Sequence, residues 1–168
     1  MMKKFRMIAV SLATMTAAAA GLSLNAFAYT LNGWDLVDSG KHLDWDGSTN
    51  YMTEWYNAVN TWNAYKPGVI RADRWDIIED VSIRDRDSYD GSVLAITSSG
   101  GTITFYHDTM DTLNSTQKQA TITHEIGHAL GLGHVTASNA IMRQGIKNFT
   151  SLSSDDKKGY DAAYKNYS

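Results

Sequence analysis

Three of the chain's five histidines, His124, His128 and His134, lie within an eleven-residue segment. On a helix, His124 and His128 are one turn apart, about 6 Å along the axis, so both imidazoles can reach one ion. Imidazole nitrogen suits zinc better than calcium or magnesium, which prefer oxygen ligands. Because the chain has no cysteine, any metal site must use nitrogen and oxygen atoms. The pattern therefore predicts a zinc site with three histidine ligands.

Glu125 follows the first of these histidines and adds a carboxylate to the segment. Three protein ligands leave the fourth position of a tetrahedral zinc open for water, which is typical of catalytic zinc. Zinc lowers the pKa of its water toward about 7, and a nearby carboxylate can take the proton and pass it to a leaving amine. We therefore assign Glu125 as the general base. The alternatives are a closed zinc site with a fourth protein ligand, in which Glu125 has no task, and solvated helix histidines.

The same segment has the pattern of an amphipathic helix. With about 100° between successive residues, Ile122 and Ile126 lie on one apolar arc and the first two histidines lie away from it. One face can pack on a sheet while another presents the ligands. Gly131 and Gly133 lie where this helix must end, and a residue without Cβ can take the left-handed conformation that reverses the chain. Such a reversal aims His134 at the same ion.

The surrounding sequence predicts both helices and strands. Trp55 and Trp62 belong to a helical pattern over residues 50–65 that ends at Lys66-Pro67-Gly68, and we expect both to pack in the core. Short β-like runs are expected at 41–45, 69–72, 81–84, 93–97 and 102–106, and further helices from about 115 to 130 and from 153 toward 167.

The residues His124, Glu125, His128, Gly131 and His134 match the motif H-E-x-x-H-x-x-G-x-x-H. On this motif the chain resembles the metzincin metallopeptidases. From the chain's own composition, the pattern is expected by chance roughly once in 10⁵ such sequences, so coincidence is a poor explanation.

Metzincins also have a methionine-containing turn beneath the metal, and Met142 lies eight residues past the third histidine, where such a turn would fall. This short spacing, followed by a helix start at 152–156, makes the chain most similar to a bacterial matrixin over most of residues 30–168. The resemblance implies an α+β, zincin-like fold: a twisted mixed five-stranded sheet with one antiparallel edge strand, two long helices, a Met-turn and a C-terminal helix. It also implies an endopeptidase with one catalytic zinc and a protein or peptide substrate.

The chain departs from other metzincins at several positions. Gln144, two residues after the methionine, replaces the tyrosine zinc ligand of astacins and serralysins. Val135 follows the third histidine, where other branches have an acidic residue or proline. Residues 93–97 contain no histidine, whereas vertebrate matrixins use a histidine in that strand to bind a second, structural zinc. We therefore expect no second zinc, and we expect His107 to be a surface or hydrogen-bonded residue.

Asp85, Asp87 and Asp90, with Gly91 after them, form an acidic loop similar in place to the calcium-binding loop of matrixins. Their spacing is not that of an EF-hand, and clustered aspartates in turns are usually just solvated. A Ca²⁺ site and a solvated turn therefore both stay open.

The first 28 residues have the pattern of a secretory signal peptide. Lys3, Lys4 and Arg6 precede an apolar run over 7–24, and Ala26-Phe27-Ala28 follows it. The alternative is a membrane anchor, since the run is nearly long enough to cross a bilayer. The small residues at its end favour cleavage after Ala28 and a secreted, extracellular protein.

Residues 29–168 are expected to form one metallopeptidase catalytic domain. Without the leader the chain has 12 basic and 18 acidic residues and a net charge of −6. Such a surface gives no basic patch for nucleic acid or for anionic lipid. We expect a monomer that binds protein or peptide substrates, with no nucleic acid and no membrane as partners.

Two other functions remain open. A secreted binding or adhesion module could keep the metal site without useful catalysis, although an intact Glu125 argues against it. A zinc hydrolase acting on a non-peptide bond is the other, because the motif determines the zinc chemistry better than the substrate.

Overall fold

The computed structural model describes residues 29–74 and 78–168. The leader expected at 1–28 lies outside the described residues. Within them, no helix is long and apolar enough to cross a membrane.

The described strands form one mixed sheet. They are β1 (Leu43–Gly47), β2 (Ile70–Ala72), β3 (Val81–Arg86), β4 (Ala95–Ser98) and β5 (Thr102–Tyr106). Their order across the sheet is β2-β1-β3-β5-β4. All neighbouring pairs are parallel except β4 and β5, which are antiparallel. The antiparallel edge strand implied by the resemblance is therefore β4.

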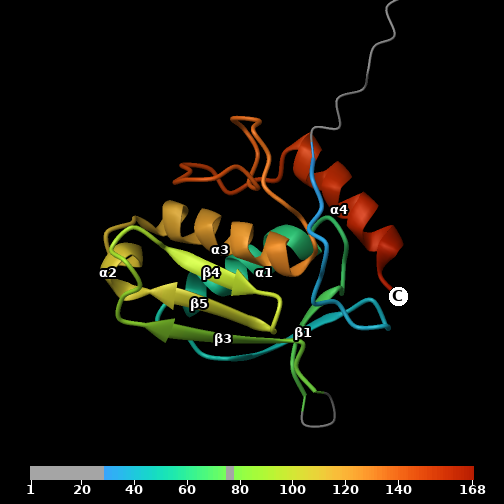
Figure 1. Cartoon of the computed structure of the whole chain (residues 1–168), viewed down its shortest axis with the longest axis horizontal. Coiled ribbons are helices and arrows are strands. Elements are labelled where there is room, and N and C mark those ends of the chain that lie inside the picture. The colour runs from blue at the N-terminus through green and yellow to red at the C-terminus, as the bar shows by residue number, and fades with distance from the viewer. Residues whose placement is uncertain (1–28, 75–77) are drawn as a thin grey trace, which may run out of the picture.

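Helices cover the sheet and one end of the molecule. They are α1 (Met52–Asn63), α2 (His107–Met110), α3 (Ser115–Ala129) and α4 (Ser154–Asn166). Helices α1 and α3 pack against each other, and α3 also contacts β4. Figure 1 shows α3 running beside the edge of the sheet that β4 forms, with α4 set apart toward the C-terminus. This arrangement places the histidine-bearing helix next to the edge strand.

The core lies between the sheet and the helices. Trp55 and Trp62 are fully buried, in agreement with the helical pattern that predicts core packing. The indole Nε1 of Trp62 donates a hydrogen bond to the Thr123 carbonyl, 2.9 Å away, and so ties α1 to α3. The same ring packs edge to face on Tyr160 of α4, with ring centroids 5.3 Å apart. One side chain thus joins three helices.

The α+β class, the five-stranded mixed sheet, the two long helices and the C-terminal helix are confirmed. The short helix α2 was not expected, because four residues are too few to show a helical period. Strand β4 begins at Ala95 instead of 93. The carbonyl of Val93 accepts a hydrogen bond from the Thr109 hydroxyl, so this residue is bonded to α2 and not to the sheet.

Candidate metal centre

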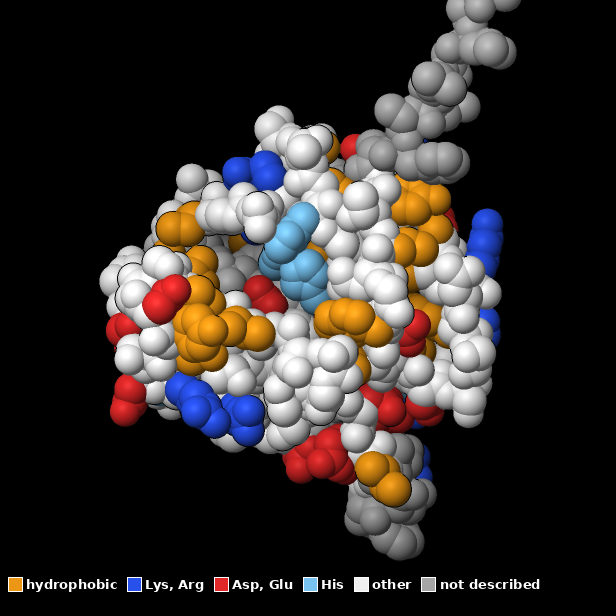
Figure 2. Space-filling view, viewed as in Figure 1, with side chains coloured by type: hydrophobic (Ala, Val, Ile, Leu, Met, Phe, Trp, Pro, Cys, Tyr) orange, Lys and Arg blue, Asp and Glu red, His pale blue; other side chains and the backbone are white. Residues whose placement is uncertain are grey.

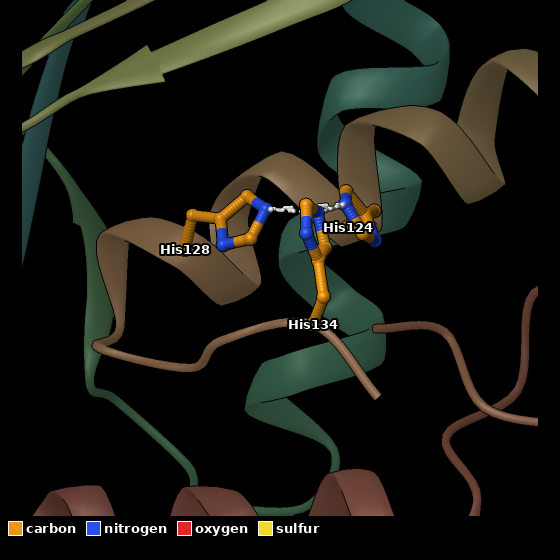
Figure 3. A group of neighbouring side chains, drawn as sticks. All are labelled: His124, His128 and His134. Atoms are coloured by element: carbon orange, nitrogen blue, oxygen red, sulfur yellow. Dashed lines mark hydrogen bonds between the residues drawn. The ribbon is translucent and has the colours of Figure 1, made fainter. Parts of the chain in front are cut away.

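The three motif histidines converge on one point, although they come from two different segments. His124 and His128 project from α3, and His134 comes from the segment that turns back after it (Figure 3). Each pair of Nε2 atoms is 3.1 Å apart. Among the described residues, no other histidine or carboxylate joins this group. Figure 2 shows histidine side chains in a hollow on this face, with hydrophobic side chains around it.

In two of these rings, the hydrogen-bond partner of Nδ1 shows which ring nitrogen carries the proton. Nδ1 of His124 lies 2.7 Å from the Ile141 carbonyl, and Nδ1 of His128 lies 2.8 Å from the Leu132 carbonyl. A carbonyl oxygen only accepts hydrogen bonds, so both Nδ1 atoms carry the proton. The Nε2 atoms of His124 and His128 therefore present bare lone pairs to each other.

This arrangement fits a bound zinc ion. Facing lone pairs 3.1 Å apart repel each other unless a cation lies between them. Tetrahedral zinc with nitrogens at about 2.0–2.1 Å keeps those nitrogens roughly 3.3 Å apart, close to the observed separation. The backbone carbonyls behind the rings also provide the outer hydrogen bonds that usually orient metal-binding histidines.

The electrostatic surroundings keep the rings neutral. Burial is the largest cause of the lowered pKa of His124, His128 and His134, and the positive charge of Lys147 lowers each pKa further. The lowering is strongest at His124, which is the most buried of the three. Neutral imidazole is the form that binds metal, so these shifts favour the predicted role.

Gly131 makes the turn that returns the chain to the centre. Its φ is +88°, which is the left-handed region expected of a helix-ending glycine. Its N–H donates to the His128 carbonyl, and the N–H of Leu132 donates to the Gly127 carbonyl, both at 2.9 Å. These two bonds form a Schellman motif, which ends α3 and sends the next residues back toward His134.

Gly133 has a different role from the one its sequence position suggested. Its φ is not positive, so only Gly131 supplies the left-handed turn. A Cβ at Gly133 would instead lie 2.5 Å from the hydroxyl oxygen of Thr30. Thr30 makes two hydrogen bonds to this segment. Its carbonyl accepts one from the Gly133 N–H, and its hydroxyl donates one to the His134 carbonyl. The missing side chain therefore lets the N-terminal segment fix the backbone of the third histidine.

Glu125 is buried beside the histidines, with 7% of its surface exposed. The hydroxyl of Thr97, on β4, donates to its Oε2 atom at 2.7 Å. Burial raises the pKa of Glu125, and the Thr97 hydrogen bond, followed by the charge of Lys147, opposes that rise. The carboxylate is therefore held in one place by the edge strand. The sequence did not predict this role of Thr97, because no local pattern indicates that it contacts a residue 28 positions away.

Met142 lies beneath the histidine helix, where the resemblance places a Met-turn. It is 1% exposed, and a Cβ at Gly127 of α3 would collide with its sulfur. Its carbonyl accepts the Val135 N–H at 3.1 Å, which links this turn to the segment that follows the third histidine. Met142 thus supports the helix from below.

Asp156 holds this turn in place, a role that the sequence did not reveal. Its two carboxylate oxygens accept the backbone N–H groups of Ile141 and Met142, at 2.9 and 3.0 Å. It also accepts the backbone N–H and the hydroxyl of Ser153, which caps α4. The sequence marked 153–156 only as a helix start, whereas the carboxylate joins that start to the turn under the metal centre.

The acidic loop gives no support for a calcium site. Asp85 accepts hydrogen bonds from the Thr49 hydroxyl and the Asn50 N–H, and Asp90 accepts them from Ser92. Among the described residues, these carboxylates do not form a metal-binding group with Asp87. His107 is hydrogen-bonded, as expected, with Nδ1 2.9 Å from the Tyr51 hydroxyl.

A cavity of about 280 Å³ opens beside the metal centre. Its walls include His124, Glu125 and His134, the edge segment 92–95, and Lys147. Lys147 lies in a polar loop that gave no sequence signal of burial. The cavity joins the three features that a hydrolase needs, namely a metal centre, a carboxylate and a surface for the substrate.

The fold and the centre together define a zincin of the metzincin class. Comparison with protein families narrows the class, because the matrixin family model matches residues 38–165. The chain therefore belongs to the matrixin family, and it is a zinc metallopeptidase domain. No curated protein matches the chain in a direct search.

The left-handed turn provides a test of how His134 is positioned. We expect Gly131→Ala to destabilise the fold by about 1–2 kcal/mol, because a residue with Cβ is strained at positive φ. Zinc affinity should fall as well, since the turn aims the third ligand. Chemical denaturation and a zinc titration measure the two effects.

Gly33→Ala is the matched control, because Gly33 has an ordinary φ and a Cβ there meets nothing within 4 Å. We expect its change in unfolding free energy to stay within about 0.5 kcal/mol. If the Gly131 and Gly33 variants unfold alike and bind zinc alike, the turn does not position the ligand.

Proposed function

We propose that this domain is a zinc endopeptidase that cleaves extended peptides, with His124, His128 and His134 as the zinc ligands and Glu125 as the general base. The observation that carries the proposal is the shared cavity, in which Glu125 and the histidines lie against the edge of the sheet. The family supports peptide hydrolysis, and the geometry supports the assignment of roles.

The edge strand offers a way to position the substrate. Strand β4 pairs with β5 on one side and ends the order of the described sheet on the other. An extended peptide can add to such an edge by backbone hydrogen bonds, which bind any sequence in a fixed register. Ala95 of β4 and the three residues before it line the cavity, so a peptide bound along β4 would pass directly beside the metal centre.

Glu125 performs the proton transfers in this proposal. The three imidazoles would hold a zinc ion, which would supply Lewis acidity to the scissile carbonyl and to the attacking water. Glu125 accepts a proton from that water and then donates it to the nitrogen of the leaving amine, as the peptide C–N bond breaks. The raised pKa of this buried carboxyl makes it a stronger base, which favours accepting the proton from the water. The Thr97 hydrogen bond holds the carboxylate in place.

We also propose that residues 1–28 direct export and are removed after Ala28, so that the domain acts outside the cell as a monomer. The basic start, the apolar run and the Ala-Phe-Ala ending support this proposal. Expression of the full chain in a secreting bacterial host, followed by N-terminal sequencing of the protein in the medium, should give Tyr29 as the first residue. Uncleaved protein retained in the membrane fraction would support an anchor instead.

Glu125→Gln tests the assignment of the base. The amide preserves the shape and leaves the histidines intact, so zinc content and unfolding should remain close to the wild type. Turnover of a casein or gelatin substrate should fall by about 10²–10⁴-fold or more, because the amide accepts no proton. Elemental analysis and a protease assay, with and without chelator, give the two readouts.

Glu79→Gln is the control, since Glu79 is exposed and lies outside the cavity. It should cleave the substrate like the wild type. Full activity of the Glu125 variant would refute the assignment, and absence of chelator-sensitive cleavage by the wild type would favour a binding module or a non-peptide substrate.

A further inference from the structure

Lys147 is a buried cation in the wall of the cavity that holds the metal centre. Only 4% of its surface is exposed, although it lies in the loop between the Met-turn and α4. Its ammonium donates to the carbonyl of Gly145, a cavity-lining neighbour, at 2.8 Å. An ammonium has three N–H donors, and among the described residues this is the one hydrogen bond that it makes.

In the part of the chain that the structure describes, this ammonium has no direct carboxylate partner. Within residues 29–74 and 78–168, no carboxylate oxygen lies within 4.0 Å of it. The negative charges of Glu125 and Asp156 raise the pKa of Lys147 only from a distance. Glu125 is hydrogen-bonded to Thr97, and Asp156 is hydrogen-bonded to backbone N–H groups. Both acids therefore have other partners.

A second cation belongs to the same loop. The guanidinium of Arg143 donates to the carbonyls of Gln144 and Ile146, at 3.2 Å, and so shapes the segment around Lys147. Burial, followed by the charge of Arg143, lowers the pKa of Lys147 to about 8. The side chain is thus still mostly protonated at neutral pH. A buried charge without a counter-ion is unfavourable, and an anion entering the cavity would relieve that cost.

We propose that Lys147 is a specificity-determining residue that selects peptides with an acidic side chain next to the scissile bond. This inference rests on the proposed peptidase function, because it describes which side chain the cavity accepts. The cavity adjoins both Glu125 and the edge segment 92–95, so a side chain flanking the cleaved bond is the one that reaches it. A Glu or Asp carboxylate can accept hydrogen bonds from the other two N–H donors of Lys147, whereas a basic side chain would be repelled by its positive charge.

The test uses matched fluorogenic peptides that carry Glu, Gln or Lys at each of the two positions flanking the bond, with cleavage sites mapped by mass spectrometry. For the wild type, kcat/KM should be about tenfold to a hundredfold higher with Glu than with Gln at one position, the range of a charge-assisted hydrogen bond. The peptide with Lys at that position should have the lowest kcat/KM of the three.

Three variants locate the effect. Lys147→Met should bring the Glu-to-Gln ratio close to unity while the Gln peptide is still cleaved, and Lys147→Arg should keep most of the preference. Lys158→Met removes the same charge from an exposed position on α4 and should leave the ratio unchanged.

The outcomes separate this inference from the proposed function. A wild type that cleaves the Gln peptide at least as well as the Glu peptide overturns the role of Lys147 and leaves the peptidase intact. A preference that survives in Lys147→Met also overturns it. If Lys147→Met fails to fold, the wild-type ratio and the Arg variant decide the question. If no peptide is cleaved, the peptidase proposal fails and the inference fails with it.

Discussion

The structure depends on holding three imidazole Nε2 atoms 3.1 Å apart at one point. The Nε2 lone pairs of His124 and His128 face each other and repel, so the chain must hold these rings firmly in place. The carbonyls of Ile141 and Leu132 fix the rings of His124 and His128 by accepting hydrogen bonds from their Nδ1 atoms. A divalent cation at the shared point converts this repulsion into binding. The rest of the domain can be understood as the means of keeping the rings in position.

Those supports come from segments that are distant in sequence. Helix α3 provides two ligands, the turn at Gly131 returns the third, and Thr30 near the N-terminus clamps its backbone. Below the helix, Met142 fills the space that Gly127 leaves open, and Asp156 ties the Met-turn to the start of α4. On the other side, Thr97 of the edge strand holds Glu125. A hydrogen bond therefore connects the edge strand directly to the candidate base.

The sequence predicted the parts of this centre that depend on local spacing. The separation of His124 and His128 by one helical turn places two ligands together on any helix, and a glycine at a helix end predicts the reversal. The roles of Thr97, Asp156 and Lys147 could not be predicted, because each depends on how segments pack in three dimensions. The same limit applies to Gly133, where the sequence suggested a turn and the packing of Thr30 is the actual constraint. The sheet topology was inferred from family resemblance, since strand patterns alone do not give an order.

The most direct test of the account is the zinc content of the folded protein. Purified wild-type domain, refolded or expressed with ample zinc and then dialysed, should retain about one zinc per chain by elemental analysis. His134→Ala, which removes one of the three ligands, should lose most of that zinc under the same dialysis. A correctly folded wild-type domain that retains no zinc at this level would contradict the central claim.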